Sequence, residues 1–139
     1  MKTLYETTVH VSGGREGKAH SLDGKLEVSL MTPKELGGPA SGTGTNPEQL
    51  FAAGYGACFE SAVRFVARGK KISIQQASVE ATAKLLGKPE GGFQLAVRLL
   101  VKLPELDRET AQALIDQAHT VCPYSNATRG NIDVEIALG

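Results

Sequence analysis

The sequence contains no tryptophan, only two cysteines and no net charge, since 15 lysines and arginines balance 15 aspartates and glutamates. Without an excess of one sign, no net field draws nucleic acid or an anionic membrane surface to the protein. No apolar run approaches the roughly 18 residues that a membrane span needs. Glu6 and His10 lie where a secretory signal would need an apolar core. We therefore predict a cytoplasmic protein that neither binds nucleic acid nor enters a membrane.

The length and composition set the domain organisation. The 139 residues, 41% hydrophobic and 22% charged, are typical of one soluble globular domain, so we predict a single domain over residues 1–139. A chain of this length buries about two thirds of the surface that it exposes when unfolded, so it needs no structural disulfide to fold. Cytosolic disulfides are usually transient and catalytic. The two cysteines are therefore free for chemistry.

Glycine and proline divide the chain into two segments, each with strands followed by a helix. Alternating apolar and polar residues predict strands over residues 3–11, 17–22, 25–31, 74–87, 92–103 and 132–138. Residues 33–45 are rich in glycine and proline, which predicts an irregular connection. The predicted class is α+β, with antiparallel sheets packed on two main helices.

The first predicted helix begins at Asn46 as N-cap, with Pro47 in its first position and Glu48 in its first turn. Residues 50–66 are apolar on almost every side, which predicts a central helix that is buried all round. A chain this small covers one face of such a helix, so the other face needs a second subunit or a second helix.

The second predicted helix begins at Asp107 as N-cap and ends or restarts at Pro123. Its apolar residues recur at helical spacing, which places Cys122 on the buried stripe near the end of the helix. The stripe consists of Ala111, Leu114, Ile115, Ala118, Val121 and Cys122.

The two cysteines lie 64 positions apart, which is unlike the spacing of a Cys-x-x-Cys redox or zinc site. Cys58 lies in the middle of the buried helix, where a lone cysteine is most simply a small core residue with a raised pKa. A reactive Cys58 therefore needs a nearby cation. Only His119 lies near Cys122 as a further ligand, so we predict no metal site.

Four segments of the chain resemble the organic hydroperoxide resistance proteins, the Ohr branch of the OsmC/Ohr superfamily. They are GGREG (13–17), TPKELGG (32–38), NPEQLFAAGYGACF (46–59) and VCPYSNATRGNIDV (121–134). The resemblance implies a peroxidase in which Cys58 attacks an organic hydroperoxide, becomes a sulfenic acid and condenses with Cys122. It also implies that Arg15 contacts the reactive sulfur and that Glu48 orients Arg15. The implied fold is the OsmC/Ohr-like fold.

The resemblance further implies an intertwined homodimer with two sites at the interface, which agrees with a helix that one subunit cannot cover. It implies no bound cofactor. The disulfide is then reduced by an external dithiol, dihydrolipoamide or a lipoylated enzyme subunit.

Simple helix geometry limits how these residues meet. Ten residues separate Glu48 from Cys58, which is about 15 Å of axial rise in a straight helix. Three alternatives remain open: the helix breaks near Gly54, Arg15 spans a longer gap, or the partner subunit supplies Glu48. We favour the partner subunit.

Apolar residues near Cys58 could form an entrance for alkyl or lipid hydroperoxides, and core packing is an equal alternative for each of them. They are Leu50, Phe51, Tyr55 and Phe59. The polar residues after Cys122 are expected to fix the following loop without a catalytic role, namely Tyr124, Ser125, Asn126 and Arg129.

Two other functions compete with the peroxidase. A cysteine hydrolase would use His119 as its base, but His119 is on the helix of Cys122, three residues away, and faces that cysteine rather than Cys58. A redox sensor or small-ligand binding module would switch between the Cys58 and Cys122 thiols and their disulfide, and so change a surface, without turnover. Turnover with a dithiol donor distinguishes the enzyme from the sensor.

Overall fold

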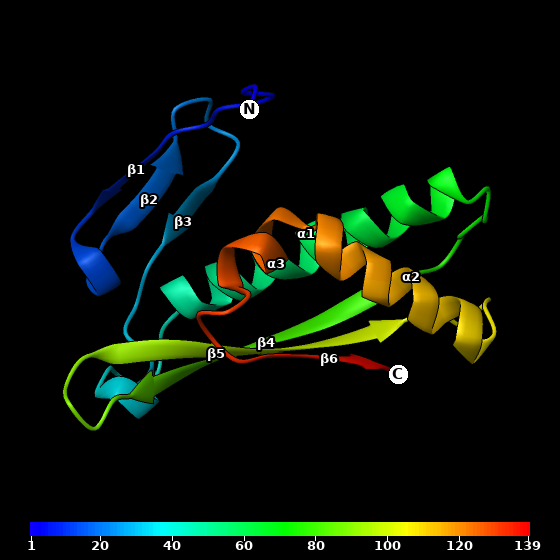
Figure 1. Ribbon diagram of the computed structural model, residues 1–139. Coiled ribbons are helices and arrows are strands. Elements are labelled where there is room, and N and C mark those ends of the chain that lie inside the picture. Colours follow the sequence, from blue (N-terminus) through cyan, green and yellow to red (C-terminus); the bar gives the residue numbers. More distant parts are fainter. The chain divides into compact units, whose positions relative to one another are not determined.

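The computed structural model describes residues 1–139 and confirms the α+β class (Figure 1). The chain forms two compact units, Met1–Leu50 and Phe51–Gly139, and the single domain over residues 1–139 stays a prediction. The first unit contains one three-stranded sheet and the second contains another. The long helix α1, Pro47–Gly69, begins in the first unit and continues through the second.

The sheet of the first unit is an antiparallel meander. Its strands are β1 (Val9–Ser12), β2 (Lys18–Ser21) and β3 (Glu27–Ser29), in that order. The predicted first strand begins only at Val9, which pairs with Ser21, the last residue of β2. Residues 3–7 have no neighbouring strand to pair with, so their alternating pattern forms no ladder.

Helix α1 begins as predicted. The Oδ1 atom of Asn46 accepts a hydrogen bond from the backbone N–H of Gln49 at 2.8 Å, which makes Asn46 the N-cap. The helix ends at Gly69, three residues later than predicted. One stripe of α1 remains exposed in the single chain, and it is a face of the kind for which the sequence predicts a second subunit or a second helix; it consists of Ala53, Ala57, Ser61 and Phe65.

The sheet of the second unit has the order β4-β5-β6. The hairpin of β4 (Ser78–Gly87) and β5 (Phe93–Lys102) matches the predicted strands and turn, and β6 (Val134–Leu138) is the predicted closing strand. However, β6 runs parallel to β5, so this sheet is mixed where we predict it antiparallel. Helices α2 and α3 lie between β5 and β6 in the chain, and such a crossover connection permits parallel pairing.

Three helices cover one face of this second sheet (Figure 1). They are α1, α2 (Arg108–Val121) and the short α3 (Pro123–Thr128). Asp107 caps α2 as predicted, because its side chain accepts from the backbone N–H of Thr110 at 3.1 Å. The core lies between the helices and the sheet and includes Phe59, Val63, Leu99, Leu114 and Ile115.

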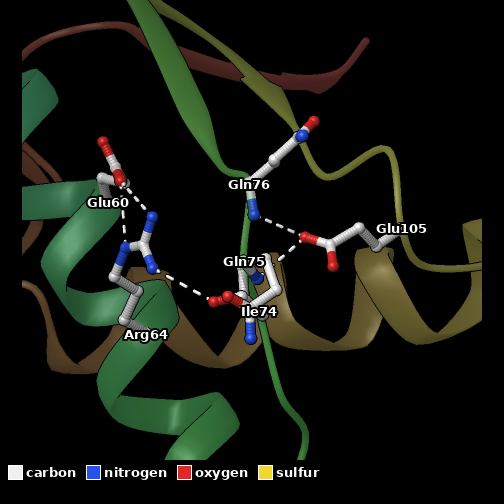
Figure 2. Close-up of polar contacts among 6 residues, drawn as sticks. All are labelled: Glu60, Arg64, Ile74, Gln75, Gln76 and Glu105. Carbon is white, nitrogen blue, oxygen red and sulfur yellow. Dashed lines mark hydrogen bonds and ion pairs between the residues drawn. The ribbon is translucent and has the colours of Figure 1, made fainter.

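The link between α1 and β4 is held by two charged side chains (Figure 2). Arg64 pairs with Glu60 one turn earlier and donates to the carbonyl oxygen of Ile74 at 3.3 Å. Glu105 accepts from the backbone N–H groups of both Gln75 and Gln76. These bonds fix the path of the chain into β4.

None of the helices combines the length and the apolar character that a membrane span needs.

Candidate active site

The two cysteines, far apart in sequence, lie side by side in the second unit. Their Sγ atoms are 3.6 Å apart, with the Cys122 thiol directed at Cys58, and both are free thiols. Cys122 has no exposed surface, whereas Cys58 is half-buried. A solute therefore meets Cys58 first. A disulfide bond is about 2.0 Å long, so the two sulfurs need to approach by only about 1.5 Å to bond.

Local structure fixes each sulfur. Cys58 lies in the continuous middle of α1. Cys122 is both the C-cap of α2 and the N-cap of α3, with φ −67° and ψ 121°. Its backbone N–H still donates to the carbonyl oxygen of Ala118 at 2.9 Å. Pro123 requires an extended residue before it, and so restarts the helix in a new direction, as predicted.

The environment of Cys58 does not by itself favour the thiolate. Burial raises the pKa of the Cys58 thiol, and the neighbouring Cys122 raises it further. The backbone N–H of Tyr124, at the start of α3, faces the sulfur and opposes this rise in pKa. The need for a cation, inferred from the sequence, therefore persists in the structure.

An open groove begins at Cys58 and runs between α1 and the end of α2. It has a volume of about 530 Å³. Apolar side chains dominate its walls, among them Phe65, which is 63% exposed, while Arg68 adds a positive charge. The sequence reasoning missed these lining residues, although Phe65 is seven residues after Cys58 and hence on the same face of the helix. The full lining is Cys58, Ser61, Ala62, Phe65, Arg68, Val121 and Pro123.

Arg15 and Glu48 form an ion pair in the first unit. The guanidinium donates two hydrogen bonds, from Nη1 to Oε2 at 2.9 Å and from Nη2 to Oε1 at 2.5 Å. The side chains are 34% and 16% exposed. This bidentate geometry fixes the plane of the guanidinium and leaves three of its five N–H donors for another acceptor.

Glycines shape the turn that carries Arg15, which lies in a short 3₁₀ helix, η1 (Gly14–Glu16). Gly13 has φ +79°, a left-handed conformation that favours glycine. A side chain at Gly17 would collide with the carbonyl oxygen of Ser12. The backbone therefore requires the glycines at positions 13 and 17 of the GGREG motif.

Backbone bonds bring the turn and the helix start together across 33 residues. The N–H of Leu30 bonds the carbonyl of Gly17, and the N–H of Met31 bonds that of Thr45, each at 2.8 Å. Thr45 precedes the cap of α1, so Leu30 and Met31, the two residues after β3, connect the Arg15 turn to the helix turn of Glu48. Within the predicted irregular segment, only η2 (Lys34–Leu36) is helical.

The ion pair stabilises the charged form of both partners. The hydrogen bond to Arg15 holds the pKa of Glu48 below its ordinary value, despite partial burial. The hydrogen bond to Glu48 raises the pKa of Arg15. Arg15 is therefore a permanent cation whose orientation is set by Glu48.

The structure thus brings the four predicted residues together as two pairs. Because α1 is continuous from Pro47 to Gly69, the predicted alternative of a helix break near Gly54 is excluded. Glu48 and Cys58 are separated along α1 by about 15 Å of rise.

The four predicted substrate-binding residues occupy different environments. Tyr55 and Phe59 are completely buried, so in this chain they are core residues and line no surface. Leu50 and Phe51 are half-buried. In the single chain, Tyr55 and Phe59 are therefore core residues, which is the alternative that the sequence left open, because their burial leaves no face for a ligand.

The predicted loop after Cys122 is instead the helix α3, and its polar residues form buried hydrogen bonds. The hydroxyl of Tyr55 bonds the Oγ of Ser125 at 2.9 Å, and Ser125 also bonds the Nδ1 of His119 at 2.8 Å. His119, the base of the hydrolase alternative, is thus engaged with Ser125, and no hydrogen bond joins it to either sulfur. No group of three or more His, Cys, Asp or Glu side chains is placed to hold a metal ion.

Comparisons with known proteins agree with the geometry. A family model described as OsmC-like protein matches residues 38–137. An organic hydroperoxide resistance protein of Xanthomonas axonopodis pv. citri is 50% identical over 99% of this chain and 96% of its own. A crystal structure of an organic hydroperoxide resistance protein from Legionella pneumophila has a TM-score of 0.94, with 49% identity over 99% of each chain.

The crystal structure of the organic hydroperoxide resistance protein OhrB of Bacillus subtilis is similar as well. Its TM-score is 0.90 and its identity 45%, covering 99% of this chain and 100% of that chain. The chain belongs to the OsmC-like family and, within it, to the branch of the organic hydroperoxide resistance proteins, as its motifs predict.

Proposed function

We propose that this protein is a cysteine-based peroxidase that reduces organic hydroperoxides, alkyl and lipid, to alcohols and so protects against organic peroxide stress. Its relatives are named organic hydroperoxide resistance proteins, which supports a role in peroxide resistance. The observation that carries the proposal is the thiol pair, with one sulfur accessible and its neighbour buried at 3.6 Å.

In the proposed cycle, the Cys58 thiolate attacks the terminal peroxide oxygen and the O–O bond breaks. The alkoxide takes up a proton and leaves as the alcohol, while Cys58 becomes a sulfenic acid. Cys122 then attacks the sulfenic sulfur, the S–S bond forms, and hydroxide leaves as water after protonation. An external dithiol, dihydrolipoamide or a lipoylated protein, reduces the disulfide and returns both thiols. No bound cofactor takes part.

Arg15 is the proposed cation of the site, oriented by Glu48. Lowering a thiol pKa by three units raises the ionised fraction roughly thirtyfold, which is about 2 kcal/mol of barrier. Enzymes commonly supply about 8 kcal/mol or more. The larger effect is therefore transition-state stabilisation, in which the free guanidinium donors hydrogen-bond the oxygen that becomes negative as the O–O bond breaks.

The proposed assembly is a homodimer whose subunits cover the exposed stripe of α1. The stripe ends in Phe65, a large side chain that is 63% exposed and lies beside Val121, itself 39% exposed. Exposed apolar surface of this kind is typical of an interaction site. In such a dimer the Arg15–Glu48 pair of one subunit serves the cysteines of the other, which removes the conflict with the 15 Å rise of α1. The proposed location is the cytoplasm.

The test is a rapid-mixing experiment on the reduced protein without oxygen. Cumene hydroperoxide or hydrogen peroxide is added, samples are quenched in acid, and the remaining thiols are counted in the wild type and in Cys58→Ser. We expect fast oxidation that requires Cys58 and prefers the organic peroxide. Repeated turnover with dihydrolipoamide then distinguishes an enzyme from a sensor. Slow oxidation that is indifferent to Cys58 contradicts the proposal.

A further inference from the structure

A buried hydrogen-bond network lies beside the two cysteines. Ser125, which has no exposed surface, bonds Tyr55 on one side and His119 on the other. The Tyr55 hydroxyl also bonds the Oγ1 of Thr128 at 3.2 Å. The members come from α1, α2 and α3, so the network joins all three helices. No buried polar side-chain atom in the structure lacks a partner.

The residues of the network are spaced regularly from the two cysteines along the chain. Tyr55 lies three residues before Cys58 on α1, and His119 and Ser125 lie three residues before and after Cys122. Residues at this spacing are neighbours on one helix face, so Tyr55, His119 and Ser125 each lie about one turn from a sulfur. The contact between the two sulfurs and the hydrogen bonds of Ser125 therefore join the same helices, about one helical turn apart.

The stability of helix α3 depends on such hydrogen bonds. Its six residues are far fewer than an isolated helix needs to be stable in water. Besides the network, Arg129 donates to the carbonyl oxygen of His119 and to Asn126 at the end of α3. Burial and the nearby Arg129 lower the pKa of His119, which favours the neutral ring, in which one nitrogen can accept from Ser125.

The close contact of α3 with α1 also requires Gly54. A side chain at this position would meet the Oη of Tyr124 at 2.5 Å. The Tyr124 ring packs against the rings of Phe51 and Tyr55, with centroids 6.1 and 5.6 Å away. Tyr124 is also the residue whose N–H faces Cys58. The position of α3 therefore sets both the Cys122 sulfur and this N–H.

We propose that Ser125 and Tyr55 are positioning residues that hold Cys122 against Cys58, so that the sulfenic acid is resolved to the disulfide before a second peroxide reaches it. The inference rests on the proposed function. Resolution forms the S–S bond and releases water. In the competing reaction the sulfenic acid attacks a second hydroperoxide, which gives a sulfinic acid and one more alcohol and ends the cycle.

The test separates the two steps by rapid quench. Reduced wild type and Ser125→Ala are mixed with cumene hydroperoxide at one and at twenty equivalents. Dimedone traps the sulfenic acid, and mass spectrometry measures the sulfenic, disulfide and sulfinic forms of Cys58. Because a displacement of about 1 Å can cost about a hundredfold in rate, we expect resolution in Ser125→Ala to slow by about tenfold or more relative to the first oxidation. The sulfinic fraction at twenty equivalents rises accordingly.

Two further variants make the result decisive. Tyr55→Phe keeps the buried ring and loses only the hydroxyl, so it carries the test if Ser125→Ala does not fold. Thr120→Ala is the matched control, because its exposed hydroxyl bonds only the carbonyl of Gln117 in its own helix. We expect the control to behave as wild type in resolution and sulfinic acid formation.

The outcomes distinguish this inference from the function on which it rests. Variants with a lowered melting temperature but wild-type resolution overturn the positioning role, because a purely structural tie changes stability alone. Wild-type protein that forms no sulfenic acid overturns the proposed function, and the inference with it. Slower resolution in both network variants, with the Thr120→Ala control unchanged, supports the positioning role.

Discussion

The cysteine pair lies among core residues of three helices, whereas the Arg15–Glu48 pair lies on a short turn and the first turn of a helix. The sulfurs lie in the core, where Cys122 has no exposed surface. Charge-assisted hydrogen bonds hold the guanidinium, which remains 34% exposed. The comparison leads us to expect that the sulfur geometry depends on the core, while the cation depends on local polar contacts whose removal changes folding little.

The largest expected effect comes from the two cysteines themselves, which differ in exposure. Cys58→Ser should lose all peroxide-dependent oxidation, because no other accessible thiol exists in the chain. Cys122→Ser should keep the first oxidation and accumulate the sulfenic acid, because only the resolving sulfur is lost. Dimedone labelling followed by mass spectrometry measures both. Equal loss of the first step in the two variants would contradict the assigned order of attack.

Arg15→Ala tests the other pair. Loss of a donor aimed at developing charge typically costs about 100-fold to 1,000-fold, so we expect at least about a hundredfold slower oxidation of Cys58. Stability should change by less than about 1 kcal/mol, as for a partly exposed ion pair. Arg15→Lys keeps the charge but loses the bidentate fork, and should recover little activity. Equal losses of activity and stability in Arg15→Ala would make Arg15 structural and break the comparison.

The same comparison explains what the sequence can predict. Local signals place Asn46, Asp107 and Pro123 correctly, because caps and prolines act within one turn. The motifs point to Arg15 and Cys122 as candidate site residues. Only the structure shows that Arg15 pairs with Glu48 and that Cys122 lies beside Cys58.

Long-range packing decides the remaining features. The parallel pairing of β6 and the start of β1 depend on which strand lies alongside. Similarly, a hydrophobic pattern cannot distinguish an exposed Phe65 from a buried Phe59, because both lie on an apolar helix.

Mixed dimers test which subunit supplies the cation. Subunits of Cys58→Ser and Arg15→Ala, each inactive alone, are mixed, unfolded and refolded together. If the ion pair acts across the interface, half of the dimers are mixed and each has one intact site, so about a quarter of wild-type activity returns. Each variant refolded alone is the control. Mixtures that remain inactive, with mixed dimers verified by native mass spectrometry, would place both pairs of a site in one chain.

The smallest expected effect is the pH dependence of the ion pair's stability. The pKa of Glu48 is depressed in the folded protein, chiefly by its hydrogen bond to Arg15, so folding favours the carboxylate. This stabilisation is complete above the ordinary pKa of about 4.5 and is lost as the pH falls through the lower folded value. Glu48→Gln should therefore be less stable than wild type at pH 7, by less than about 1 kcal/mol, and the difference should shrink below about pH 4.5. Urea unfolding at pH 7 and pH 3.5 measures the difference. A constant difference would show that Glu48 acts by packing, as the cysteines do, and would remove the contrast between the two pairs.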